Sequence, residues 1–334
     1  MRLLCLIAAV AATAFACAAC KPQTAPSRAA GMAMVQTIPL EGVSGRIDHM
    51  AADVKGQRLF VAAIGSGSVE VIDLAAGKRT ARIKGLKEPQ SVAYLPDLNR
   101  LVVACAGDGT VRLYDGQTFQ PVRTVDLKSD ADNVRYDPAA RRVYVGYGSG
   151  AIAAIDAETG AVVADIRLKG HPESFQLERN GKRLFVNVPT AGHVAVIDRE
   201  KAAVIAAWPL KIAQANFAMA LDETHGRLFV GCRQPARLVV MNTESGETVA
   251  DLACAGDTDD IFFDAAARRI YLSGGLGRLD VFDQTDANHY ARAGDIETAL
   301  GARTSLFVPE LGRLYVAVPN LLFGKAEIRV FKTM

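Results

Sequence analysis

The stretch RLFVAAIGSGSVEVIDLAAGKRTARI, residues 58–83, contains three short apolar segments separated by turn residues. Gly65 and Gly67 separate the first two segments, and Asp73 with Gly77 separates the second from the third. Glycine permits tight turns, and an Asp side chain starts a turn by binding backbone amides. Segments rich in Val and Ile between such turns are typical of strands. The stretch therefore predicts consecutive antiparallel strands.

The same pattern repeats along the chain. An arginine followed by three apolar residues recurs seven times, with the arginines 41 to 44 residues apart. These anchor arginines are Arg58, Arg100, Arg142, Arg183, Arg227, Arg269 and Arg313. Each unit also has one apolar run before this segment and further runs after it, so each unit predicts four short strands. Four strands in about 42 residues is typical of a β-propeller blade.

The ends of the chain predict how the ring closes. The last unit stops after its third strand, at residues 328–331, whereas residues 35–40 (VQTIPL) match a fourth strand at residues 122–127 (VRTVDL). An open ring would leave two unpaired strand edges. We therefore predict one all-β domain over residues 34–334. It is a seven-bladed β-propeller with four antiparallel strands per blade, and its N-terminal strand closes the last blade.

Two of the units carry a family resemblance. Residues 58–83 and residues 142–166 (RVYVGYGSGAIAAIDAETGAVVADI) resemble the YVTN-type propeller repeats of exported bacterial and archaeal proteins. The resemblance extends over nearly the whole chain after residue 33. It implies the propeller fold and export, whereas a fold of this kind does not fix the chemistry of its sites.

The amino terminus has the features of an export signal. Arg2 precedes an apolar run that ends in small residues before Cys20, and this run is too short to span a bilayer. We expect a lipoprotein-like signal peptide over residues 1–20, with Cys17 or Cys20 as the lipidated residue and ordinary cleavage as the alternative. Residues 21–33 then form a flexible linker. These expectations place the protein in the periplasm or cell envelope.

Composition excludes several classes of partner. The chain of 334 residues is 50% hydrophobic and carries a net charge of +2. This near-balance gives no reason to expect nucleic acid, and membrane contact is expected only through the lipid anchor. Beyond residue 20, the cysteines are Cys105, Cys232 and Cys254. We expect three buried thiols, with a Cys232–Cys254 disulfide as the alternative.

Counting back from the anchor arginines predicts a ring of polar residues at the mouth of the central channel. The residues expected at one level are Asp48, Gln90, Asp132, Glu173, Phe217, Asp259 and Thr304. The residues expected at the next level are His49, Ser91, Asn133, Ser174, Ala218, Asp260 and Ser305.

This ring predicts a binding site. Carboxylates crowded together require a cation between them, and either Arg46 or a metal ion could supply it. The candidate ligands of a divalent cation are Asp48, His49, Asn133 and Asp260; otherwise no cofactor is expected. The alternative is that these polar side chains bind loop amides and solvate the channel.

Loops between the second and third strands of each unit form the other lip of the mouth. His193 lies in one such loop, and Arg233 and Arg237 in another could hold an anionic group. His171 adjoins the ring and could join His49. In the last unit, the insertion at residues 319–325 (PNLLFGK) predicts a lid, a partner contact or packing over the ring closure.

Three functions are compatible with these residues. The first is an exported, lipid-anchored propeller that binds a small ligand or a protein partner at the channel mouth without catalysis. The second is a metal-dependent hydrolase or lactonase with a divalent ion there. The third follows from a similarity to the haem-bearing propeller of bacterial nitrite reductase, and implies a non-covalent haem. The sequence has no HExxH or GxSxG motif, and it has no CxxC motif beyond residue 20.

Overall fold

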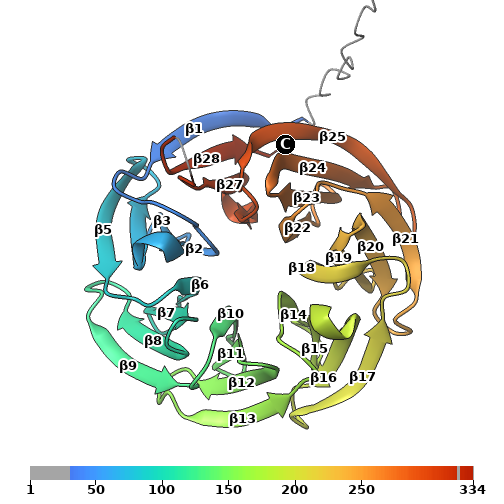
Figure 1. The fold of residues 1–334 in the computed structure, drawn as a ribbon, viewed down its shortest axis with the longest axis horizontal. Coiled ribbons are helices and arrows are strands. Elements are labelled where there is room, and N and C mark those ends of the chain that lie inside the picture. Colours follow the sequence, from blue (N-terminus) through green and yellow to red (C-terminus); the bar gives the residue numbers. More distant parts are fainter. Residues whose placement is uncertain (1–30, 322–323, 334) are drawn as a thin grey trace, which may run out of the picture.

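The computed structural model describes residues 31–321 and 324–333. Its strands form seven four-stranded antiparallel sheets arranged in a ring around a central axis, which is the predicted propeller (Figure 1). The signal peptide, Cys17, Cys20 and most of the linker lie outside the described residues.

Blades 1 to 3 follow one another along the chain. Blade 1 consists of β2 (Met50–Asp53), β3 (Arg58–Ala63), β4 (Ser68–Asp73) and β5 (Lys78–Lys84). Blade 2 consists of β6 (Pro89–Leu95), β7 (Arg100–Cys105), β8 (Thr110–Asp115) and β9 (Pro121–Asp126). Blade 3 consists of β10 (Ala131–Asp137), β11 (Arg142–Tyr147), β12 (Ala151–Asp156) and β13 (Val162–Arg167).

Blades 4 to 7 complete the ring. Blade 4 consists of β14 (Phe175–Leu177), β15 (Arg183–Val188), β16 (His193–Asp198) and β17 (Ala203–Pro209). Blade 5 consists of β18 (Gln214–Asp222), β19 (Arg227–Gln234), β20 (Ala236–Asn242) and β21 (Thr248–Ala253). Blade 6 consists of β22 (Thr258–Asp264), β23 (Arg269–Gly274), β24 (Leu276–Gln284) and β25 (Tyr290–Leu300). Blade 7 consists of β26 (Ser305–Val308), β27 (Arg313–Val318), β28 (Glu327–Lys332) and β1 (Ala33–Pro39).

Closure occurs as the sequence predicts, because β1 pairs antiparallel with β28. The outer strand pair of each blade also contains a register shift, and the shift in the β1–β28 pair lies between Met34 and Gln36. In blade 1 the equivalent shift follows Val71 in β4. Such a bulge increases the local twist of a strand pair. The N-terminal strand therefore has the same geometry as the other outer strands.

Two recurrent side chains hold the blades. The Asp or Asn that ends the third strand accepts backbone hydrogen bonds from the turn, as Asp115 does from Gln117 and Thr118 at 3.0 and 2.8 Å. This is the predicted turn chemistry. Some anchor arginines reach the following blade, and Arg183 donates through Nη1 to the Thr243 carbonyl at 2.7 Å. The repeated arginine thus joins neighbouring blades.

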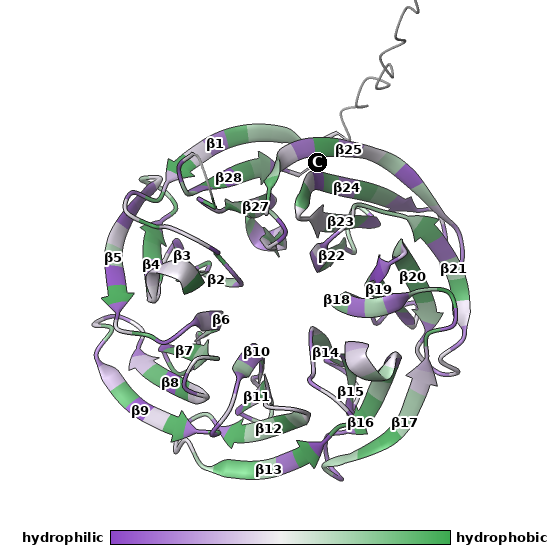
Figure 2. Ribbon diagram, in the orientation of Figure 1, coloured by the Kyte–Doolittle hydropathy of each residue, from purple (hydrophilic) through white to green (hydrophobic). Residues whose placement is uncertain are grey.

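The core lies between the sheets. The second and third strands are mostly buried and apolar, and they are largely green in Figure 2. All three cysteines of the described chain are free, so the alternative Cys232–Cys254 disulfide is wrong. Cys105 and Cys232 are buried as expected, and Cys254 is half-buried.

Helical structure in the described chain is limited to short 3-10 turns. These are η1 (Ile64–Ser66), η2 (Pro189–Ala191) and η3 (Pro309–Leu311). Between residues 31 and 333, leaving out 322 and 323, no helix has the length and apolar character needed to cross a membrane.

Candidate functional site

The start of each inner strand delivers one side chain to a common cavity at the channel mouth. We call these residues the ring positions: Asp48, Gln90, Asp132, Glu173, Phe217, Asp259 and Arg303. All seven line a cavity of about 310 Å³, here called the mouth cavity. Its other lining residues are Arg46, His49, Asp130, His171 and Arg233. Residues from all seven blades therefore meet at one site.

The ring position of blade 7 corrects the sequence prediction. Ser305 pairs with Val316 in β27, as Met50 pairs with Val61 in β3. Arg303, two residues before Ser305, is therefore level with Asp48, and Thr304 lies one place deeper. Thr304 is buried, with its hydroxyl 3.4 Å from the Ile47 carbonyl. The interval of ten residues between ring position and anchor arginine thus holds in blade 7 as well.

Backbone hydrogen bonds between blades fix these strand starts. The amide of His49 donates to the Gln90 carbonyl at 3.1 Å, and the amide of Ser174 donates to the Phe217 carbonyl at 3.2 Å. Each bond joins one inner strand to the next blade, so the ring side chains are held by the backbone of two blades.

Arginines and aspartates alternate along one side of the mouth cavity. Arg233 lies 2.9 Å from Asp259 and 3.4 Å from Asp257, and Arg303 lies 3.1 Å from each of the same carboxylates. The Arg233 guanidinium also covers the Phe217 ring at 3.6 Å from its centroid. Burial raises the pKa of Asp259, and Arg233 opposes that rise. The two arginines thus neutralise the two aspartates.

His49 lies between two carboxylates. Its Nε2 is 3.7 Å from Asp48 and its Nδ1 is 3.4 Å from Asp260. Burial alone would lower the pKa of His49, but Asp260 and Asp48 together raise it to about 10. Burial raises the pKa of Asp48 to about 7, although His49 and Arg46 oppose that rise. At neutral pH the imidazole is therefore a cation held between acidic groups.

A second histidine lies on the opposite side of the mouth cavity. His171 Nδ1 is 2.6 Å from the Gly148 carbonyl, so this nitrogen donates, and Nε2 is 3.8 Å from Asp132. Burial would lower the pKa of His171, but Asp132 and the Gly148 carbonyl raise it to about 9. Burial with the nearby charge of Asp132 raises the pKa of Glu173 to about 8. Within the described chain, the Glu173 carboxylate has no hydrogen bond or ion pair.

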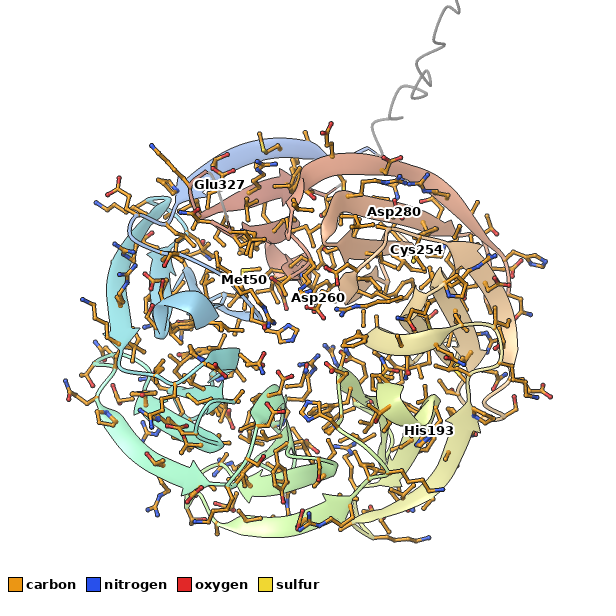
Figure 3. All side chains as sticks on the ribbon, in the orientation of Figure 1. Met50, His193, Cys254, Asp260, Asp280 and Glu327 are labelled. Atoms are coloured by element: carbon orange, nitrogen blue, oxygen red, sulfur yellow. The ribbon has the colours of Figure 1, made fainter. Side chains whose placement is uncertain are left out.

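The remaining predicted site residues lie elsewhere. Figure 3 places Asp260 beside the hub and His193 away from it. His193 is buried, and its Nδ1 lies 3.2 Å from the Ala191 carbonyl. Arg237 pairs with Asp251 on β21 at 2.8 Å. Neither residue lines the mouth cavity, because the loop before β16 and the turn before β20 stand farther from the channel than the inner strands.

Three of the four predicted metal ligands are in contact. His49 faces Asp48 and Asp260, whereas Asn133 is buried with no partner for its Oδ1 atom. In the part of the chain that the structure describes, no cluster of three or more His, Cys, Asp or Glu side chains has a geometry that could hold a metal ion. The divalent-cation site stays a prediction.

Sequence reasoning missed Asp130 and Arg303 as members of the site. Arg303 could have been found by applying the interval of ten residues consistently. Asp130 precedes the ring position by two residues and lies 3.5 Å from His171. No repeat feature marks that place in the sequence, because Gln90 and Asp48 are preceded at the same distance by Glu88 and Arg46.

Comparison with known proteins gives distant relatives. Dihydro-heme d1 dehydrogenase of Pseudomonas aeruginosa is 24% identical over 318 residues, which cover 86% of this chain and 60% of that protein. The uncharacterized protein YncE of Salmonella typhimurium is 22% identical over 234 residues, which cover 68% of this chain and 61% of that protein. The chain thus spans about 60% of the length of these curated relatives. No protein-family model matches.

Solved structures share the fold. Hydrazine synthase of Kuenenia stuttgartiensis superposes with a TM-score of 0.73 at 18% identity, covering 87% of this chain and 98% of that one. A chain of the mitotic checkpoint complex superposes with a TM-score of 0.78 at 15% identity, covering 98% and 99%. The chain is therefore a seven-bladed β-propeller with YncE-like bacterial relatives, and membership of the YVTN-type family stays a prediction.

Proposed function

We propose that this chain is an exported, lipid-anchored binding protein of the cell envelope, whose mouth cavity holds a small ligand or a group of a protein partner without catalysing a reaction. One observation carries the proposal. The anchor position is arginine in all seven blades, whereas the ring positions carry acidic, amide, aromatic and basic side chains. A purely structural role would be served by the same residue in each blade. A binding site requires different side chains at equivalent positions of the repeats, and the ring positions have them.

The mouth cavity also has the chemistry of a binding site. Nearly all its lining groups are polar, and most of them come from the segments that begin the inner strands, which the sheets hold in place. Charged groups at fixed positions in a concave site give orientation and specificity to a polar ligand.

A matched pair of double variants tests the proposal. Asp48→Ala with His49→Ala removes one contact pair of the mouth cavity. Asp286→Ala with His289→Ala removes an exposed Asp–His pair, 2.8 Å apart, in the β24–β25 turn. A thermal-shift screen of small polar compounds on the wild-type chain identifies binders. We expect the first variant to lose the shifts and the second to keep them. Shifts that persist in the mouth variant would contradict the proposal.

A second candidate function comes from the name of one relative. Dihydro-heme d1 dehydrogenase is similar over most of this chain, and a non-covalent haem or related macrocycle is accordingly a candidate ligand. An absorbance spectrum of the protein purified from its native host tests this candidate, because a bound macrocycle of this kind absorbs visible light.

The metal-dependent hydrolase or lactonase remains the catalytic alternative. It requires a divalent ion to bind one ring nitrogen of His49 in place of its proton, beside Asp48 or Asp260. Elemental analysis before and after chelation, followed by an assay of lactone hydrolysis, separates it from the binding protein. Activity lost on chelation and restored by metal would favour the enzyme.

A further inference from the structure

Two exposed leucines form a pair on the mouth face of blade 6. Leu276 begins β24 and Leu300 ends β25, and the two are register partners. Their exposed fractions are 67% and 66%. Single exposed apolar residues are ordinary, but a paired group next to a cavity is typical of a contact surface.

The fold does not require either leucine. The corresponding turns of blades 1 to 3 carry polar residues at their tips: Ser66, Asp108 and Ser149. In blade 6 the tip between Gly275 and Gly277 is Leu276. The outer strand β25 has eleven residues, whereas β9 and β13 each have six. Blade 6 therefore departs from the repeat at both positions that create the pair.

The pair belongs to a second cavity, which we call the leucine groove. Its volume is about 290 Å³, and most of its exposed lining is apolar. The apolar lining residues are Ile47, Leu276, Leu300, Pro319 and Leu321. Arg46 and Arg303 line both the leucine groove and the mouth cavity. The two cavities therefore meet at a pair of guanidinium groups.

These two arginines have unused hydrogen-bond donors. Arg46 donates to Asp48 through Nη2 at 2.9 Å, and its side chain is 48% exposed. Among the described residues, neither Nε nor Nη1 of Arg46 donates a side-chain hydrogen bond, and neither does Nη2 of Arg303. Asp257 also lines the groove, but Arg233 and Arg303 already neutralise it. With two arginines and one aspartate, the charged lining of the groove is net positive.

We propose that the leucine groove and the adjoining rim of the mouth cavity bind a small amphipathic carboxylate. Its apolar body lies on Leu276 and Leu300, and its carboxylate pairs with Arg46 and Arg303. A guanidinium with free donors recognises a carboxylate through two parallel hydrogen bonds. Burial of the ligand's apolar body against the two leucines adds a hydrophobic contribution to the binding free energy. This inference rests on the proposed function, because it names the ligand class of the same mouth.

The described chain begins on the face opposite the leucine groove. The described chain enters β1 at Ala33, which pairs with Lys332, and Lys332 also pairs with Arg313. That end of blade 7 is the face opposite the mouth. Leu276 and Leu300 are exposed in the described chain, so a molecule from solution can reach the groove.

Octanoate is the probe, and isothermal titration calorimetry on the purified protein without its signal peptide is the measurement. We expect octanoate to bind at least about tenfold more tightly than acetate, which lacks the apolar body, and than octylammonium, which has the opposite charge. Arg46→Gln should weaken octanoate binding about tenfold, because it removes the guanidinium group whose Nε and Nη1 atoms are unused donors.

Matched apolar variants test the groove itself. Leu276→Ser with Leu300→Ser should weaken octanoate binding about tenfold or more, whereas Val204→Ser with Ile205→Ser, at exposed positions of β17, should leave it unchanged. Octanoate binding that survives the leucine change, or a preference for octylammonium, would overturn the inference. If the polar compounds found in the screen depend on Asp48 and His49 while octanoate does not bind, the proposed function stands and this inference fails.

Discussion

Glu173 is a ring carboxyl group that, within the described chain, has no hydrogen bond or ion pair. Burial and the charge of Asp132 raise its pKa to about 8, so the folded state holds a proton that the unfolded chain releases near pH 4.5. Stability from this group is complete below that lower value and is lost as pH rises through 8. The folded protein therefore becomes less stable between pH 5 and 9 because of this residue.

Glu173→Gln should remove the loss of stability that Glu173 causes as the pH rises. Glutamine resembles the protonated acid, so the variant and the wild type should have similar free energies of unfolding at pH 5. At pH 9 the variant should be more stable by roughly 1–3 kcal/mol, a range reduced from the full shift because the carboxyl is partly exposed. Urea denaturation at both pH values measures the difference. Glu200→Gln, at an exposed position on the opposite face, is the control and should show no such dependence.

Individual residues of the site were predictable only where the repeat positions them. Asp48, Asp132, Glu173 and Asp259 occupy one level of the propeller, and a fixed interval from the anchor arginine finds them. His193 was misplaced because its loop stands away from the hub. Contacts such as that between His171 and the Gly148 carbonyl join different blades, and no sequence interval encodes them.

At the scale of elements, sequence similarity between the repeats correctly predicted the outer strand β1. The similarity of residues 35–40 to residues 122–127 predicted a fourth strand for blade 7, and the structure has it at Ala33–Pro39. The match works because both strands pair with a third strand through the same bulge. The leucine groove could not be found in this way, because it forms where blade 6 departs from the pattern.

The closing strand should contribute strongly to stability. Ile38 is fully buried and pairs in register with Ile328, so Ile38→Ala should lower the free energy of unfolding by about 2–4 kcal/mol. Val35 lies in the same strand with half of its surface exposed. Val35→Ala should therefore change the free energy of unfolding by about 0.5 kcal/mol or less. Urea denaturation monitored by fluorescence compares the two variants. Equal effects would mean that β1 contributes little to closing the ring.

At the scale of the whole molecule, the direction of β1 bears on how an anchored propeller would be oriented. Ala33 lies at the end of blade 7 opposite the mouth, and Pro39 lies at the mouth end beside Glu327. A lipid on Cys17 or Cys20 would therefore tether the propeller from the face opposite the mouth. Residues 21–33 could extend by about 45 Å at most, at roughly 3.3–3.6 Å per residue. We accordingly predict that the mouth faces away from the membrane.

Site-specific fluorophores on the lipidated protein in vesicles test this orientation. The variant lacks Cys105, Cys232 and Cys254 and keeps only the lipidated cysteine of the amino terminus. One labelling cysteine then replaces either Thr190, in the mouth-face loop of blade 4, or Glu200, in the opposite turn of the same blade. A quencher attached to lipid headgroups should reduce the emission of the Glu200→Cys label more than that of the Thr190→Cys label, because quenching falls steeply with distance from the bilayer. Cys17→Ser with Cys20→Ser should release the protein from the membrane and remove the quenching at both sites. Stronger quenching at Thr190→Cys would contradict the predicted orientation, because it would place the mouth face nearer to the bilayer than the opposite face.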